Sequence, residues 1–272
     1  MTTNLTLTDQ GVAYLTLNRP EVHNAFDDHL IDQLLDHLVS VKQQQARLLV
    51  LGAKGQHFSA GADLNWMRRM AKASESDNLQ DAHQLAQLMH QLDQLPCPTI
   101  ARVQGAAYGG AVGLVACCDL AIATSSARFC LSEVKIGLIP AVISPFVSRA
   151  IGLRAMRHYA LTAEVIDAET AQRLGLITHR VPLPNSGASA QTGLDEAVDH
   201  YVQQLLAASP QSLQQTKALL HHIEHTPLGP QLLDHTCQVI AQARVSAQGQ
   251  EGLNAFLEKR PPQWPTFKPE HP

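Results

Sequence analysis

T-I-A-R-V-Q-G-A-A-Y-G-G-A, residues 99–111, decides the fold: a short strand candidate, Thr99–Val103, runs directly into a glycine-rich turn. Small residues in such a turn let backbone N–H groups approach a ligand atom closely. A second segment of this kind, H-F-S-A-G-A-D, occupies residues 57–63. Two N–H groups aimed at one point form an oxyanion hole, which favours an enolate-like transition state over the ground-state carbonyl. The alternative is that both segments are tight turns in which small residues only pack.

Strand-like and helix-like patterns alternate around this stretch. Val12–Leu17 and Arg47–Leu51 are predicted strands, and a helix followed by a strand is expected over 105–123. Apolar residues at helical spacing predict helices over 27–43 (Leu30, Ile31, Leu34, Leu35, Leu38) and 78–94 (Leu79, Ala82, Leu85, Ala86, Met89, Leu92). This alternation indicates an α/β architecture with right-handed crossovers.

The C-terminal part has a different character. Residues 184–193, P-N-S-G-A-S-A-Q-T-G, are typical of a linker, and helical patterns follow over 194–208, 210–225 and 229–247. We therefore divide the chain into a core over 1–193 and a helical region over 194–272. The long apolar faces of these helices predict contacts between subunits; they include Leu213, Leu219, Leu220 and Ile223.

Composition excludes several classes of protein. With 20 Lys and Arg against 24 Asp and Glu, the formal charge of −4 and the absence of a basic block argue against nucleic-acid binding. The apolar stretch 105–118 is shorter than the roughly 20 residues that span a bilayer, so no membrane segment is expected.

Five cysteines without C-x-x-C spacing predict buried reduced thiols. His221 and His225 lack the H-E-x-x-H order, so no metal site is expected. Residues 1–8 do not resemble a secretory signal, and a cytoplasmic protein is expected.

Short motifs along almost the whole chain occur in the order and spacing of one family. They are N-R-P-E-V-H-N-A-F (18–26), S-A-G-A-D (59–63), G-A-A-Y-G-G (105–110), S-E-V-K-I-G (132–137), A-I-G-L-R-A (150–155), L-T-A-E-V-I-D-A (161–168), A-Q-R-L-G-L-I (171–177) and E-G-L-N-A-F-L-E-K-R (251–260). The chain resembles the enoyl-CoA hydratase/isomerase (crotonase) family. The resemblance implies a crotonase-like spiral of ββα units over 1–193, a C-terminal helical oligomerisation region and a homotrimer or hexamer.

The resemblance also assigns roles to individual residues. It implies that the N–H groups of Ala62 and Gly110 form the oxyanion hole for an acyl-CoA thioester. The implied CoA-binding residues are Arg19, Val22, His23, Ala25, Ala60, Asp63, Leu64, Phe256 and Lys259. The implied acyl pocket contains Trp66, Met67, Gly113 and Ser144. No metal and no cofactor are implied, because CoA is part of the substrate.

The acid–base residues depart from the pattern of the two-carboxylate hydratases in this family. Those enzymes carry one Glu three residues after the oxyanion glycine and another twenty residues later. Here the first position is Gly113 and the second is Glu133. Apolar neighbours around Glu133 predict a raised pKa, which suits a general acid–base. A salt bridge from Glu133 to Lys135 or to an arginine is the alternative.

The substrate is predicted from a finer resemblance. Residues 63–67, 112–119, 129–133 and the loop P-A-V-I-S-P-F at 140–146 resemble the methylglutaconyl-CoA hydratase branch, which serves leucine or acyclic-terpene breakdown in bacteria. Hydration of 3-methylglutaconyl-CoA, or of a related branched 2-enoyl-CoA, is therefore expected. Arg68 and Arg69 are candidates to meet the second carboxylate of that substrate. Two alternatives stay open: an enoyl-CoA Δ-isomerase, which needs one carboxylate, and a non-catalytic acyl-CoA- or RNA-binding relative.

Overall fold

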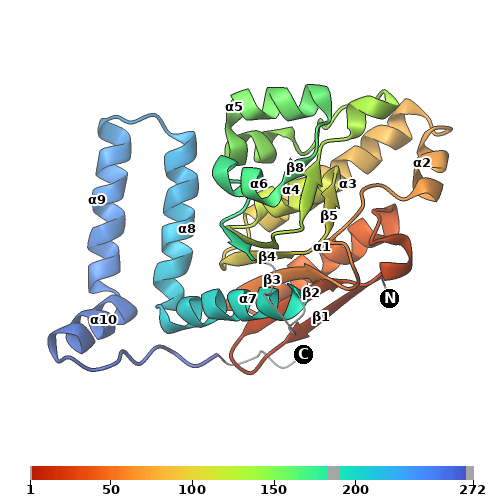
Figure 1. The fold of residues 1–272 in the computed structure, drawn as a ribbon. Helices are drawn as coiled ribbons and strands as arrows, with labels where there is room; N and C mark the ends of the chain where they lie inside the picture. The colour runs from red at the N-terminus through yellow and green to blue at the C-terminus, as the bar shows by residue number, and fades with distance from the viewer. Residues whose placement is uncertain (1, 183–189, 268–272) are drawn as a thin grey trace.

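The computed structural model describes residues 2–182 and 190–267, and its centre is a six-stranded sheet (Figure 1). The strand order is β1-β2-β3-β4-β6-β9, in which β1 is antiparallel to β2 and all later neighbours are parallel. The strands are β1 Thr3–Leu7, β2 Val12–Leu17, β3 Leu48–Ala53, β4 Thr99–Val103, β6 Leu120–Thr124 and β9 His179–Val181. This parallel sheet confirms the predicted α/β architecture.

Short extended segments form a second row that follows the long strands along the chain. β5 Ala106–Tyr108, β7 Arg128–Cys130 and β8 Ile166–Asp167 form a three-stranded sheet. Single bridges continue the row, from Phe26 to Ala62 and from Ser59 to Ala107. Each long strand from β2 to β6 is thus followed by a short one and then by a helix. This succession is the predicted series of ββα units.

Helices cover one face of the large sheet and enclose the main apolar core: α1 Asp28–Gln43, α3 Glu75–Asp93, α4 Gly110–Cys117, α5 Ser144–Thr162 and α6 Ala168–Leu174. The short helix α2 Leu64–Met70 buries no residue and lies at the edge of the molecule (Figure 1), and short 3-10 turns occur at η1 Pro20–Val22 and η2 Glu133–Ile136. Asp27 caps α1 by accepting a hydrogen bond from Leu30 N at 2.8 Å. Leu30, Ile31, Leu34 and Leu38, whose spacing predicted the helix over 27–43, are buried. Leu79, in the first turns of α3, is 57% exposed.

The other face of the sheet is covered by α7 Ala190–Ala207, which packs Leu194, Val198 and Val202 against β2, β3, β4 and β6. The predicted division at 193/194 therefore falls inside a helix that belongs to the sheet. The first part of the predicted linker, 184–189, lies outside the described residues. Its last part, 190–193, is helical and not linker, because this turn lies against β9: a Cβ added to Gly193 would be 3.4 Å from Val181 Cγ1.

The remaining helices extend away from the sheet (Figure 1): α8 Pro210–His225, α9 Pro230–Val245 and α10 Ala247–Leu257. The single helix predicted over 229–247 in fact ends at Val245, because Ser246 caps α10 by accepting from Gly249 N at 3.0 Å. Cys237 on α9 is exposed, which corrects the prediction that all five thiols are buried. No helix within the described residues is long and apolar enough to cross a membrane.

We expect the chain to be oligomeric, because this helical region and its connections leave large apolar side chains uncovered. Leu220, Leu228 and Val245 are 59%, 83% and 77% exposed, and contiguous exposed apolar surface marks a contact site. Sedimentation at micromolar concentration should show an assembly larger than one chain. Leu220→Glu should shift it towards the monomer, whereas a stable wild-type monomer would contradict the prediction.

Candidate active site

The row of short strands brings three distant residues to one place. Ala62 lies at the end of the segment bridged to Phe26, Gly110 follows β5 by two residues, and Glu133 follows β7 by three. Because β5 and β7 are parallel neighbours, with Tyr108 opposite Cys130, the segments leave the row at the same edge. Ala62, Gly110 and Glu133 line one cavity there.

Both N–H groups of the predicted oxyanion hole are free. In the bridge to Phe26, the residues that bond are Gly61, through its carbonyl, and Asp63, through its N–H. The N–H of Ala62 therefore points away from that strand. Gly110 is the first residue of α4, where a helix leaves its N–H groups without internal acceptors and at its positive end. Among the described residues neither N–H has an acceptor, so both are available to a ligand oxygen.

Gly109 fixes the turn between β5 and α4. Its φ of 55° and ψ of −124° form a conformation that glycine adopts readily, and its N–H donates to Cys130 O at 2.9 Å. A Cβ added there would lie 3.2 Å from Glu133 Oε1. The carboxyl of Glu133 therefore lies directly against the oxyanion turn.

Glu133 carries the carboxyl that the sequence selects, and one of its two oxygens has no hydrogen-bond partner among the described residues. Its Oε2 atom is buried without a hydrogen bond among the described residues. The alternative salt bridge to Lys135 or to an arginine is not formed within this part of the chain. Burial raises the pKa of Glu133, as predicted from its apolar neighbours. A raised pKa brings a carboxyl closer to the range in which it can both accept and return a proton.

This environment predicts that Glu133→Gln stabilises the fold at neutral pH. A folded-state pKa above the unfolded value means that wild-type stability falls as pH rises from about 4 through the raised pKa. The variant should melt at a higher temperature than wild type at pH 7, and the difference should vanish towards pH 4. The exposed Glu75→Gln on α3 serves as the control. A gain in melting temperature that is the same at pH 4 and pH 7 would contradict the assignment of Glu133 as a buried carboxylate with an unpaired oxygen.

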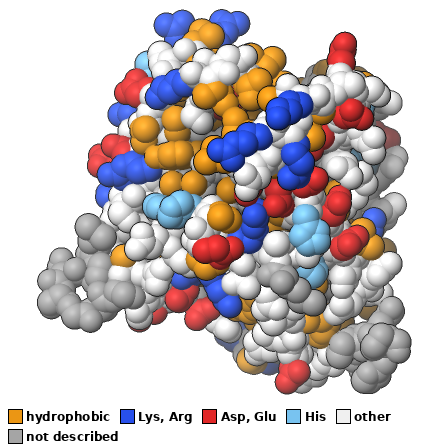
Figure 2. All heavy atoms as spheres, turned by 90° about the vertical axis from the view of Figure 1, so that its right-hand side faces the viewer, with side chains coloured by type: hydrophobic (Ala, Val, Ile, Leu, Met, Phe, Trp, Pro, Cys, Tyr) orange, Lys and Arg blue, Asp and Glu red, His pale blue; other side chains and the backbone are white. Residues whose placement is uncertain are grey.

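The cavity around these groups has a volume of about 570 Å³ and a largely apolar wall. Figure 2, seen from the side that carries α2, shows hydrophobic side chains gathered on this face with Lys and Arg around them. The loop after η2 contributes Leu138 and Ile139, which are 55% and 72% exposed. The remaining lining residues are Phe26, Ile31, Gly61, Trp66, Asn78, Asp81, Ala82, Leu85, Gly137, Pro140, Ala141, Val142 and Ile143.

Gly113, the position of the missing carboxylate, is closed by other side chains. A Cβ added there would overlap Ile143 Cγ2, and it would lie 2.9 Å from Ile143 Cβ and 3.1 Å from Met89 Cε. Ile143 is only 2% exposed and belongs to the main core. A carboxylate at position 113 therefore has no room in this structure.

Gly113→Ala should destabilise the fold by about 1–3 kcal/mol, the usual cost of overpacking a core. The crowding atoms belong to Ile143, whose branched side chain has few alternative rotamers. Chemical denaturation would measure the loss. Gly110→Ala is the matched control in the same helix, since a Cβ there meets nothing within 4 Å. Equal stability of the two variants would show that position 113 is not crowded.

Most residues assigned to CoA lie around the loops that frame the cavity, but two of them are engaged internally. Arg19 donates to Asp27 Oδ2 at 2.7 Å, to Asp63 Oδ2 at 3.1 Å and to Ala25 O at 2.9 Å. Arg19 and Asp63 therefore tie the 19–27 loop to the oxyanion loop. Val22, His23, Ala60 and Leu64 are exposed beside them.

Four other predicted residues lie elsewhere. Phe256, 81% exposed on α10, and Lys259, just beyond it, lie at the opposite end of the molecule from α2 (Figure 1). Within one chain they do not meet the cavity. Met67 and Ser144 do not line it either; the hydroxyl of Ser144 instead donates to Pro140 O at 2.6 Å, at the start of α5. The loop that precedes Ser144 forms the wall.

Asp81 lines the same cavity and was not predicted from the sequence. Asn78, Asp81, Ala82 and Leu85 follow one face of α3 at spacings of three and four residues. That spacing was visible in the predicted helix, beside its apolar stripe.

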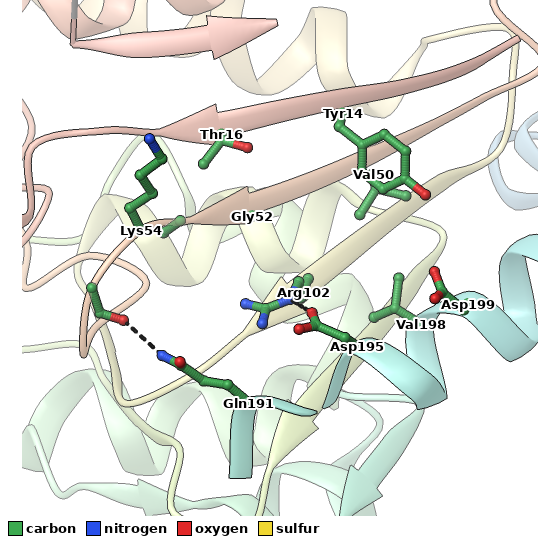
Figure 3. A pocket seen from close by; sticks show the side chains of 12 residues that line it. Tyr14, Thr16, Val50, Gly52, Lys54, Arg102, Gln191, Asp195, Val198 and Asp199 are labelled. Atoms are coloured by element: carbon green, nitrogen blue, oxygen red, sulfur yellow. Dashed lines mark hydrogen bonds and ion pairs between the residues drawn. The ribbon is translucent and has the colours of Figure 1, made fainter. Parts of the chain in front are cut away.

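A second cavity, of about 380 Å³, lies between the sheet and α7 (Figure 3). Two polar contacts cross it: Arg102 Nε donates to Asp195 Oδ1 at 2.6 Å, and Gln191 Nε2 donates to Gly55 O at 3.2 Å. These contacts fasten α7 to the sheet. The chemistry predicted from the sequence belongs to the cavity at Glu133.

A model of the enoyl-CoA hydratase/isomerase family matches residues 8–266. The chain belongs to this family. An enoyl-CoA hydratase of Shewanella pealeana is 49% identical with a TM-score of 0.90, over 97% of this chain and 96% of that one. The enoyl-CoA isomerase/hydratase fer4 of Mycosarcoma maydis is 32% identical, over 93% of this chain and 92% of the relative. A trans-2-decenoyl-[acyl-carrier-protein] isomerase of Streptococcus mutans is 29% identical, over 94% and 95%. These matches confirm the family and the crotonase fold, and the relatives are named for both hydration and isomerisation.

Proposed function

We propose that this member of the enoyl-CoA hydratase/isomerase family hydrates a 2-enoyl-CoA. The observation that carries the proposal is the meeting of two free N–H groups with one unpaired carboxyl on a single cavity: Ala62, Gly110 and Glu133. The N–H groups hold the thioester oxygen and stabilise the enolate that forms when C3 is attacked. No cofactor is needed beyond the CoA that the substrate brings.

Glu133 moves the protons in this mechanism. As a carboxylate it accepts one proton from water while the water oxygen bonds to C3 and the electron pair of the double bond passes to the thioester oxygen. The protonated Glu133 then returns that proton to Cα and the carbonyl re-forms. Water is thus added without a net change in the enzyme. The raised pKa of Glu133 suits both steps.

For the acyl group we propose 3-methylglutaconyl-CoA or a related branched acyl-CoA, on the basis of the finer resemblance. The apolar wall and the volume of about 570 Å³ support a branched chain. Arg68 and Arg69 do not line the cavity; they bond instead to Asn65 and Asp28, at 2.8 and 2.7 Å. Comparison of a neutral with an anionic branched substrate is therefore part of the test.

Isomerisation is the second candidate, and the closed position at Gly113 is the observation that favours it. Moving a double bond needs one base, which takes a proton from C2 of a 3-enoyl-CoA and returns it to C4. Glu133 beside the oxyanion turn can serve that reaction without a second group at position 113.

A panel of acyl-CoA thioesters separates these reactions. It contains straight and branched 2-enoyl-CoAs, 3-methylglutaconyl-CoA and 3-enoyl-CoAs, followed by the absorbance of the conjugated thioester and by product mass. Hydration adds the mass of water, whereas isomerisation changes absorbance at constant mass. Gain of water with 3-methylglutaconyl-CoA above the other substrates supports the full proposal. Binding of acyl-CoA without turnover of any member would identify a non-catalytic relative.

A further inference from the structure

Two of the residues that line the active-site cavity ionise: Glu133 and Asp81. Glu133 is used by the proposed mechanism, whereas Asp81, on α3, is not. A carboxylate at the wall of a mostly apolar cavity needs a reason, because partial burial disfavours its charge. Burial indeed raises the pKa of Asp81.

One oxygen of Asp81 is held in place and the other is available. Trp66 Nε1 donates to Asp81 Oδ1 at 3.0 Å. Trp66 lies one helical turn after Ala62, on the helix that Asp63 caps, so this hydrogen bond connects Asp81 to the oxyanion loop. Oδ2 has no partner among the described residues, and it is not a fully buried atom. Asp81 thus lines the cavity that contains Glu133, with one oxygen held by Trp66 and the other without a hydrogen-bond partner among the described residues.

Hydration needs an acceptor of this kind. The attacking water must be held with its oxygen towards C3 while it loses one proton to Glu133. In the two-carboxylate hydratases of the family a second carboxylate is available for this, but its position, Gly113, is closed here by Ile143. We propose that Asp81 holds the reacting water, replacing the absent carboxylate at Gly113 from a different helix. This inference rests on the proposed hydration.

The proton balance is unchanged by this role. One O–H of the water donates to Asp81 Oδ2 and stays on the oxygen, which becomes the hydroxyl at C3. The other proton passes to Glu133 and from there to Cα. Asp81 ends the cycle as it began, so it is required for addition of water and not for exchange of the Cα proton.

Asp81→Asn tests whether Asp81 is needed for addition of water but not for exchange of the Cα proton. The Trp66 N–H needs an acceptor, so the amide oxygen takes the place of Oδ1 and the NH₂ group replaces Oδ2. The water then faces a donor instead of an acceptor. Hydration should fall about 10–100-fold, the range expected for loss of a hydrogen bond to a charged group. Exchange of the Cα proton with deuterated solvent, measured on the hydrated product or a saturated acyl-CoA, should continue within a few-fold of wild type. That exchange also shows that the variant is folded.

Two further variants exclude a structural role. If Asp81 only satisfies the Trp66 N–H, Trp66→Phe combined with Asp81→Leu removes both partners and should restore hydration. Restored hydration would overturn the inference, and so would normal hydration by Asp81→Asn. Hydration that stays low while exchange persists supports it. Glu75→Gln, an exposed acidic residue of the same helix, should leave both rates unchanged. A wild type that isomerises but hydrates no substrate would defeat the proposed function itself, which is a different result.

Discussion

Gly110→Pro is expected to leave the chain folded and to lower turnover by about two to three orders of magnitude. Gly110 is the first residue of α4, where proline is well accommodated, and a Cβ there meets nothing within 4 Å. The substitution removes the N–H that is free in this structure. Loss of one oxyanion donor typically costs about 3–4 kcal/mol of transition-state stabilisation. Turnover of an enoyl-CoA substrate and thermal melting are the two measurements.

Gly110→Ala provides the matched comparison, because it adds a side-chain atom at the same position and keeps the N–H. The ratio of turnover between the Ala and Pro variants isolates the contribution of the donor from that of the added carbon. If the proline variant is folded and turns over as fast as the alanine variant, Gly110 does not hold the thioester oxygen.

Ala62, Gly110 and Glu133 could be named from the sequence because each belongs to a short motif that resembles the corresponding motif of the family. A-G-A-D, G-G and S-E-V-K-I-G each end a short strand, and the parallel row of those strands brings their ends together. The strands at Val12–Leu17 and Thr99–Val103 and the helices over 27–43 and 78–94 were predicted because their periodicity is local, whereas β1 and α2 were not predicted. The roles of Ala62, Gly110 and Glu133 were expected from the family resemblance, and the structure brings the three residues to one cavity.

The features that the sequence did not predict depend on contacts between distant segments. The closure at Gly113 is made by Ile143 and Met89, which come from the loop before α5 and from α3. Asp81 faces the cavity because of how α3 lies across the site, and no motif marks it. Likewise, α7 begins inside a segment with the composition of a linker because its first turn lies against Val181. Tertiary packing overrides local composition at each of these places.

In the proposed mechanism, two walls of the cavity have different roles. The edge of the short strands would supply the oxyanion donors and Glu133, which both hydration and isomerisation would use. The α3 wall would supply Asp81, which would be needed only when water is the second reactant. If both proposals hold, changes at α3 should affect hydration and leave isomerisation intact.

Glu133→Gln should abolish turnover while leaving acyl-CoA binding nearly intact. Gln is close in shape to Glu, so the surrounding apolar side chains should still pack around it. The lost function is the transfer of a proton to and from Cα, and no carboxylate can occupy position 113 to replace it. The loss should be at least the roughly 10²–10⁴-fold that general acid–base catalysis contributes. Turnover and acyl-CoA affinity, measured on the same preparation, separate catalysis from binding.

Exchange of the Cα proton gives the sharper measurement. Glu133 is the only group in the mechanism that carries this proton, so exchange should disappear together with hydration in Glu133→Gln. Asp81→Asn is the comparison variant, because it should lose hydration and keep exchange. Exchange that survives in Glu133→Gln while hydration stops would reveal another base at Cα, and Asp81 is the ionisable side chain on the described cavity wall that could supply it. In that case the roles of the two carboxylates would be reversed: Asp81 would move the Cα proton and Glu133 would hold the water.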